Sequence, residues 1–290
     1  MDRLTGLVFG GCGIGATDFA PISLRRTRTM KTILVTGAAG GIATQTRPLL
    51  REHYRLRLSD RAAVPDATAA ETVVAADLGD LDALRRAVNG VDGILHLGGY
   101  AVEAAWDIIH EANIVGCYNL FEAARLEGVR RIVFASSNHA VGFYPRSETI
   151  GIEAPVRPDT RYGLSKAFGE ALGALYAYKY GAEVLSIRIG NVTGEPGDLR
   201  RLAIWQSPRD FVQLVRIGLE RPGIRHEIVY GMSDNKRAWW DNANAYRLGY
   251  APQDRSEDYA DKVLASDPGP SGDPRVDHNQ GGPFCIAEVI

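Results

Sequence analysis

The chain has 290 residues, 45% of them hydrophobic, and its 33 basic and 35 acidic residues leave a formal net charge of −2. This balance gives no electrostatic reason to expect nucleic acid or an anionic membrane as a partner, and no apolar run approaches the roughly 18 residues of a membrane span. The three cysteines lie far apart in the sequence and match no metal-ligand spacing. We therefore expect a cytoplasmic protein without a metal site.

The two ends of the chain differ from its middle. Residues 1–30 contain a glycine-rich stretch, but no periodic helix follows it, and Met30 directly precedes a strong strand pattern. We predict a disordered extension there. Residues 266–290 are rich in Gly, Pro and Asp, which predicts an irregular tail.

Between these ends, short β-branched runs alternate with helical patterns. Strands are predicted at 32–36, 55–59, 72–75, 93–97, 131–135 and 184–188, and helices at 42–51, 81–88, 102–127 (one long helix or a broken pair) and 161–180. Alternation of this kind predicts an α/β protein, a Rossmann-type doubly wound parallel sheet, over residues 31–190. The rhythm breaks after Gly190, so residues 191–265 are predicted to form a small substrate lobe.

A glycine loop follows the first predicted strand and opens the first helix. It reads Gly37-Ala38-Ala39-Gly40-Gly41-Ile42-Ala43. Gly37 permits a tight turn, and Gly40 lets backbone N–H groups approach a pyrophosphate at the positive end of the helix. Because the loop lies between a strand and a helix, Gly37, Gly40, Gly41 and Ile42 are predicted to bind a dinucleotide.

Acidic and small residues end the next strands. Asp60 follows Gly40 by the twenty residues expected of an acid that hydrogen-bonds the ribose 2′-hydroxyl, which favours NAD over NADP, although the adjacent Arg61 could accept a 2′-phosphate. Asp77 either faces the adenine amino group beside Leu78 or caps a helix. Leu97 and Gly98 let the backbone run along the cofactor. His96 is interpreted as a packed residue.

A phenol and an amine four residues apart predict the reaction centre. Tyr162 and Lys166 lie on one helical face, where an ammonium one turn away, together with oxidised nicotinamide, favours a phenolate base. A decrease of about three in the pKa of that tyrosine corresponds to about 4 kcal/mol. Ser137 ends the fifth strand and is predicted to orient a substrate oxygen, because open parallel sheets bind ligands there.

In this order, the glycine loop, Asp60, Ser137 and Tyr162/Lys166 resemble the extended short-chain dehydrogenase/reductase family over about residues 31–190. Longer strings, R-I-V-F-A-S-S-N-H (131–139), Y-G-L-S-K-A-F-G-E (162–170), R-I-G-N (188–191) and W-W-D-N (239–242), resemble the uronate dehydrogenases, with a weaker similarity in N-Q-G-G-P-F (279–284). The resemblance implies NAD-dependent oxidation at C1 of a hexuronic acid to a lactone.

Carried over residue by residue, the resemblance assigns a substrate pocket. Tyr162 is the implied general base on the C1 hydroxyl, and Ser137 would hold the same oxygen. Asn138 and His139 would line the sugar site, and Arg200 would bind the sugar carboxylate. Ala101 and Asn191 stand where that family tends to carry serines that contact the substrate. We interpret the W-W-D-N motif mainly as packing of the lobe. A homo-oligomer is expected.

Several alternatives stay open at this point. R-I-G-N-V-T (188–193) and E-I-V-Y-G-M-S-D-N (227–235) look closer to haloarchaeal NAD-dependent glucose-6-phosphate dehydrogenases, although the chain lacks their acidic excess. Sugar-nucleotide epimerases share the Tyr/Lys centre but need room for a bulky nucleotide. Dehydratases need an Asp-Glu pair where this chain has Asn138-His139. A non-catalytic NAD sensor would usually have lost the Tyr162/Lys166 pair.

Overall fold

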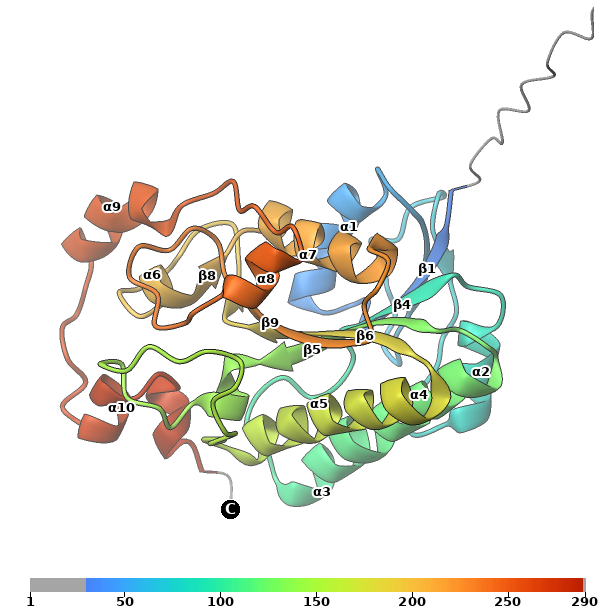
Figure 1. Ribbon diagram of the computed structural model, residues 1–290, viewed down its shortest axis with the longest axis horizontal. Coiled ribbons are helices and arrows are strands. Elements are labelled where there is room, and N and C mark those ends of the chain that lie inside the picture. The colour runs from blue at the N-terminus through green and yellow to red at the C-terminus, as the bar shows by residue number, and fades with distance from the viewer. Residues whose placement is uncertain (1–29, 289–290) are drawn as a thin grey trace, which may run out of the picture.

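The computed structural model describes residues 30–288, so nearly all of the predicted N-terminal extension lies outside the described residues. A seven-stranded sheet with the order β3-β2-β1-β4-β5-β6-β9 forms the centre of the molecule (Figure 1), and every neighbouring pair in it is parallel. The predicted Rossmann-type doubly wound α/β fold is thereby confirmed. Its strands are β1 (Thr32–Thr36), β2 (Arg55–Ser59), β3 (Thr72–Val73), β4 (Gly93–His96), β5 (Arg131–Ser137), β6 (Glu183–Ile189) and β9 (His226–Gly231).

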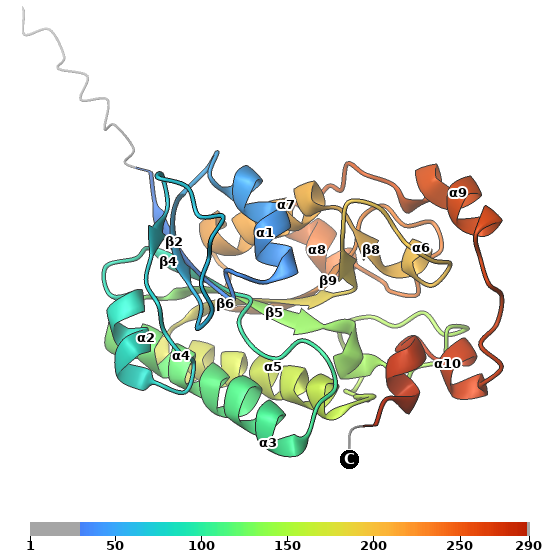
Figure 2. The same ribbon diagram turned by 180° about the vertical axis from the view of Figure 1, so that it is seen from behind.

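Helices cover both faces of this sheet, which explains the continuous apolar runs of its central strands. In Figures 1 and 2, α1 (Gly41–Leu50) and α7 (Pro208–Glu220) lie on one face, while α2 (Leu81–Val88), α4 (Gly116–Leu126) and α5 (Arg161–Tyr180) lie on the other. All four residues of β4 are buried, as expected for a strand with covered faces. Separate hydrophobic clusters fill the two layers between sheet and helices.

The predicted helix at 102–127 is interrupted by a π-helical segment. It begins as α3 (Trp106–Ile109), passes through a π-helix over His110–Val115, and continues as α4. π-Helical turns inside α-helices occur frequently at functional sites. The interruption lies on the chain segment that follows β4, beside the carboxyl edge of the sheet.

The sheet continues beyond residue 190, where the sequence predicts the start of a substrate lobe. Helix α7 begins at the cap Ser207, and β9 then pairs in parallel with β6. The first three residues of β9 are only half-buried at this sheet edge, so its sequence H-E-I-V-Y-G mixes polar and apolar residues and hides the strand pattern. Part of the predicted lobe therefore belongs to the doubly wound core.

The remaining segments gather at the carboxyl ends of the strands, the end toward which the β5 arrow points in Figure 1. They comprise β7 (Asn191–Val192), α6 (Arg201–Ile204), β8 (Trp205–Gln206), α9 (Ala260–Ala265) and α10 (Pro274–His278), with 3₁₀ turns at Asn138–Val141, Ser256–Tyr259 and Gly282–Ile286. Helix α8 (Ala243–Arg247) instead packs beside α7 against β9. The predicted irregular tail is thus partly helical within the described residues.

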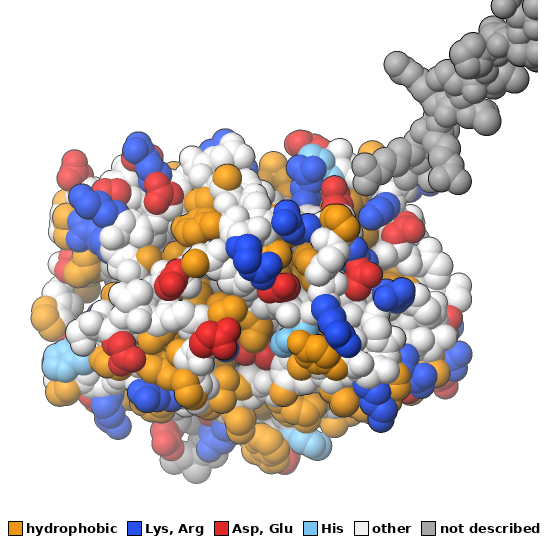
Figure 3. Space-filling model, in the orientation of Figure 1, with side chains coloured by type: hydrophobic (Ala, Val, Ile, Leu, Met, Phe, Trp, Pro, Cys, Tyr) orange, Lys and Arg blue, Asp and Glu red, His pale blue; other side chains and the backbone are white. Residues whose placement is uncertain are grey.

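The surface mixes charged and apolar side chains (Figure 3), and exposed hydrophobic side chains gather in the lower part of that view, where α4 and α5 lie. Leu164, Leu175 and Tyr178 of α5 are among the exposed ones. In residues 30–288, no helix is both long enough and apolar enough to cross a membrane.

Candidate active site

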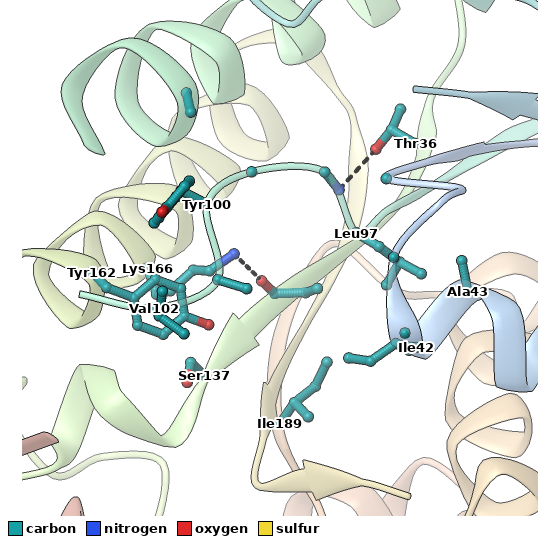
Figure 4. Close-up of a pocket in the computed structure, with 18 of the residues that line it drawn as sticks. Thr36, Ile42, Ala43, Leu97, Tyr100, Val102, Ser137, Tyr162, Lys166 and Ile189 are labelled. Atoms are coloured by element: carbon teal, nitrogen blue, oxygen red, sulfur yellow. Dashed lines mark hydrogen bonds between the residues drawn. The ribbon is translucent and has the colours of Figure 1, made fainter. Parts of the chain in front are cut away.

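A cavity of about 740 Å³ opens at the carboxyl ends of the strands, where doubly wound sheets bind their ligands. Its wall combines the glycine loop, the ends of β4, β5 and β6 and the start of α5 (Figure 4). The end of β2 and the C-terminal tail complete it. The cavity brings together every predicted site residue except Asn138: Gly37, Gly40, Gly41, Ile42, Asp60, Arg61, Asp77, Leu78, Leu97, Gly98, Ala101, Ser137, His139, Tyr162, Lys166, Asn191 and Arg200.

The glycine loop has the shape required to receive a pyrophosphate. Gly37 has a φ of 67°, and a Cβ there would lie 2.7 Å from the backbone nitrogen of Gly98. Gly40 caps α1 in an extended conformation without any side-chain hydrogen bond to the helix. The first N–H groups of α1 therefore remain available to an anion at the positive end of the helix.

Asp60 is held at the end of β2 by hydrogen bonds from two backbone amides. Its carboxylate accepts hydrogen bonds from the amides of Ala39 (3.0 Å) and Ala62 (2.9 Å). This geometry ties the acid to the glycine loop and fits a carboxylate beside a ribose. Arg61 lines the same part of the cavity with an exposed side chain.

Asp77 is not a helix cap, so that alternative is wrong. The carboxylate that caps α2 belongs to Asp80, which accepts from the amide of Ala83 at 2.9 Å. Asp77 instead accepts from the amide of Gly79 at 2.8 Å and lines the cavity. His96 is packed beneath the site, where its ring hydrogen-bonds the Thr36 hydroxyl (2.7 Å) and burial lowers its pKa to about 3.

Tyr162 and Lys166 point into the cavity from α5, opposite the end of β5 (Figure 4). The helix begins after Thr160, whose hydroxyl accepts from the amide of Gly163 and so fixes the first turn. Nζ of Lys166 lies 5.5 Å from the centroid of the Tyr162 ring and donates to the carbonyl of Ala135 at 2.9 Å.

Burial opposes ionisation of both groups. It raises the pKa of Tyr162 to about 12, against the opposing effect of the Ser137 hydroxyl, and it lowers the pKa of Lys166 to about 8. The lowered tyrosine pKa expected with oxidised nicotinamide stays a prediction, because the protein alone holds this pKa high. The positive charge that stabilises a phenolate has to be supplied when the cofactor binds.

Asn113, in the π-helical segment, was missed by the sequence reading. Its side-chain oxygen accepts from the amide of Tyr100 (2.6 Å), and its nitrogen donates to the Tyr100 carbonyl (2.9 Å) and to the Ser165 hydroxyl (2.9 Å). Asn113 thereby joins the loop after β4 to the catalytic helix. No local motif marks it, because the π-turn that aims it inward has no clear sequence pattern.

His139 and the unpredicted Phe284 line the cavity next to Tyr162, and the unpredicted Asp159 lies behind His139. Nδ1 of His139 lies 2.6 Å from a carboxylate oxygen of the buried Asp159, and burial lowers the pKa of the imidazole. With the Nδ1 proton directed at that carboxylate, Nε2 is an acceptor for a sugar hydroxyl. The ring of Phe284 stacks on His139 with centroids 3.8 Å apart, so the tail closes this side.

Arg200 presents a charged fork to the same cavity. Its Nε donates to the carbonyl of Gln280 at 2.8 Å. Its Nη2 donates to the side-chain oxygen of Asn138 at 3.1 Å, in the amide orientation in which the Asn138 nitrogen donates to the carbonyl of Ile189. Asn138 is buried and does not line the cavity, so it contacts Arg200 rather than the open pocket. Burial lowers the pKa of Arg200 to about 10, which leaves the guanidinium charged at neutral pH.

Arg200 lacks a carboxylate partner among residues 30–288, whereas the neighbouring Arg201 forms a salt bridge with Asp198. An unneutralised guanidinium in a cavity is a site for an anion. Asn191 lines the cavity close by and accepts a hydrogen bond from the Thr193 hydroxyl at 3.1 Å. Ala101 adds no polar group.

The comparisons with known proteins agree with this geometry. The model of the NAD dependent epimerase/dehydratase family matches residues 33–240. A uronate dehydrogenase from Pseudomonas putida is 46% identical over 90% of this chain and 98% of its own. The crystal structure of a mutant uronate dehydrogenase from Agrobacterium tumefaciens in complex with NAD has a TM-score of 0.87 and 41% identity, covering 90% of this chain and 99% of that one.

A relative with another substrate is more distant. An NAD-dependent glucose-6-phosphate dehydrogenase from Haloferax volcanii is 38% identical over 78% of this chain and 95% of its own. Fold, cavity and sequence similarity therefore lead to one assignment. The chain belongs to the NAD-dependent epimerase/dehydratase family, within which it is similar to the uronate dehydrogenases.

Proposed function

We propose that the protein oxidises the C1 hydroxyl of a hexuronic acid, glucuronate or galacturonate, to a lactone with NAD. The observation that carries the proposal is Arg200, a charged guanidinium that faces the cavity of Tyr162 and Ser137 without a carboxylate partner in residues 30–288. High identity to uronate dehydrogenases supports the same substrate class.

The residues of the cavity fit NAD. The Gly37 turn, the uncapped start of α1 and the Asp60 carboxylate would hold the pyrophosphate and the adenosine ribose. Lys166 would bind the nicotinamide ribose from the other side of the cleft. When bound, NAD supplies the hydride acceptor for C1.

Residues of the chain accept the proton that leaves the C1 hydroxyl. Tyr162 takes the proton of the C1 hydroxyl as its general base, while Ser137 holds the same oxygen by a hydrogen bond. The ammonium of Lys166 stabilises the phenolate form of Tyr162. His139 accepts a hydrogen bond from a ring hydroxyl through Nε2, because its Nδ1 is bonded to Asp159.

A carboxylate suits this cavity better than a phosphate. Of the two adjacent arginines, Arg201 is already neutralised by Asp198, whose carboxylate also accepts from the Arg201 amide at 2.7 Å. One unpaired guanidinium matches the single negative charge of a uronate, whereas a phosphate monoester carries up to two. Glucose 6-phosphate is therefore the second candidate.

Replacing Arg200 by glutamine tests the proposal. We expect kcat/KM for glucuronate to fall about 100-fold, since one charge-assisted hydrogen bond contributes roughly 3 kcal/mol. NADH binding, followed by fluorescence, stays unchanged, and Arg201→Gln serves as the matched control on the neighbouring residue. An equal loss in both variants, or none in Arg200→Gln, contradicts the assigned role of Arg200.

Oligomeric state and cellular location stay predictions. We expect a cytoplasmic homo-oligomer, and light scattering on the purified protein measures the oligomeric state directly.

A further inference from the structure

The last segment of the described chain crosses the substrate end of the cavity. Residues 279–284, which we call the strap, are bonded to the loop that follows β5. The amides of Gln280 and Gly281 donate to the carbonyls of Tyr144 (2.9 Å) and Gly142 (2.8 Å), and Arg146 donates through Nε to the carbonyl of Asn279 at 3.0 Å. The strap is therefore held along its backbone and not only by side-chain packing.

Gln280 is the anchor of the strap. Its side chain is fully buried, and each of its polar atoms has a partner. The Gln280 Nε2 donates to the carbonyls of Pro145 (3.2 Å) and Glu148 (3.0 Å), and its Oε1 accepts from the indole of Trp240 (2.8 Å). Through this side chain the strap, the loop after β5 and the W-W-D-N segment are joined in one network.

The strap contacts Arg200 and the Asp159–His139 pair directly. The Gln280 carbonyl accepts from Nε of Arg200, and a Cβ on Gly282 would come within 2.7 Å of the same side chain. A Cβ on Gly281 would lie 2.0 Å from the Asp159 oxygen that is bonded to His139, so only glycine fits between strap and carboxylate. Phe284 completes the contact by stacking on the His139 ring.

From these contacts we propose that the strap fixes the positions of Arg200 and His139 and thereby sets the selectivity for an anionic sugar. Gln280 and Gly281 are its positioning residues, and neither needs to touch the substrate. The inference rests on the proposed function, because it names how the anion site of that function is built.

Preorganisation is the physical reason for such a strap. A free arginine side chain samples many rotamers, and ordering it when substrate binds weakens the affinity. With Nε bonded to Gln280 and Nη2 bonded to Asn138, the guanidinium is held with its remaining N–H groups available to the cavity. Loss of the strap should therefore raise the KM for the charged substrate more than it lowers kcat.

The experiment compares Gly282→Ala, whose Cβ would press on the Arg200 side chain, with Gly269→Ala, a control glycine that also has a positive φ but at which a Cβ would meet nothing within 4 Å. We expect Gly282→Ala to raise the KM for glucuronate by about tenfold or more, with kcat, NADH binding and kcat/KM for free glucose changed by less than about threefold. In an Arg200→Gln background the same change should add less than about twofold, because both substitutions act through one guanidinium.

Equal effects on glucuronate and glucose, or full additivity with Arg200→Gln, would overturn the proposal, since a general packing defect behaves in that way. Hydrogen exchange supplies a readout without turnover. We expect slow exchange across residues 279–284 in the unmodified protein, and faster exchange there and at 142–148 in Gln280→Leu. If the protein oxidises no uronate, the proposed function fails. Hydrogen exchange still tests whether residues 279–284 are held in place. Rapid exchange of 279–284 in the unmodified protein overturns it.

Discussion

Replacement of Lys166 by methionine probes the electrostatics of the reaction centre. Burial holds the pKa of Tyr162 near 12 without cofactor, so reaching a phenolate at pH 8 requires about 5 kcal/mol of stabilisation. A unit charge 5.5 Å away supplies about 3 kcal/mol at an effective dielectric constant of about 20, equivalent to about 2 in pKa. Because the pKa near 12 belongs to the protein with Lys166 in place, loss of this charge should raise the pKa of Tyr162 by about 2, and the bound cofactor has to supply the 5 kcal/mol.

The pH dependence of kcat at saturating NAD measures the contribution of the Lys166 charge. Tyr162 acts as a base, so turnover falls as pH drops below its apparent pKa, and Lys166→Met should move this rising limb up by about 2. At pH values below this limb, turnover by Lys166→Met should be about 100-fold lower than turnover by the unmodified protein. Lys179→Met, on the exposed side of the same helix, provides the control. A loss of turnover without movement of the limb refutes the electrostatic role and leaves only cofactor binding for Lys166.

Three other substitutions test separate parts of the account. Gly37→Ala should weaken NADH binding at least about tenfold in a fluorescence titration, because a positive φ and contact with Gly98 both oppose a Cβ. Arg188→Met breaks a buried, two-bond pair with Glu170 and should reduce the free energy of unfolding in urea by about 3–5 kcal/mol; a loss below about 1 kcal/mol contradicts that reading. Asp60→Asn removes a negative charge that repels a 2′-phosphate, so the preference for NAD over NADP, measured as a ratio of kcat/KM, should drop about tenfold or more.

Local motifs made the cofactor half of the site predictable. A glycine turn such as that at Gly37, an acid after the second strand, and a Tyr/Lys pair one helical turn apart each have a spacing imposed by backbone geometry. The cavity brings these residues together as expected. The same logic failed at β9, because an edge strand with half-buried residues lacks the continuous apolar run of a central strand.

The substrate half depends on contacts between distant parts of the chain. Phe284 and Asp159 both contact His139, but no spacing links them in sequence. Asn138 was expected to face the sugar, yet the turn after β5 directs it to Arg200. Side-chain direction in loops and tails is set by tertiary packing, so a single sequence cannot reveal which of these groups line the pocket.

Reduction of NAD by a panel of sugars tests the central claim most directly. Glucuronate, galacturonate, glucose 6-phosphate and free glucose are each offered with NAD and with NADP, and NADH or NADPH formation is followed by absorbance. The account predicts rapid turnover of one or both uronates with NAD and little with the other two sugars. Rapid turnover of glucose 6-phosphate alone, or silence with every sugar while NAD still binds, would contradict it.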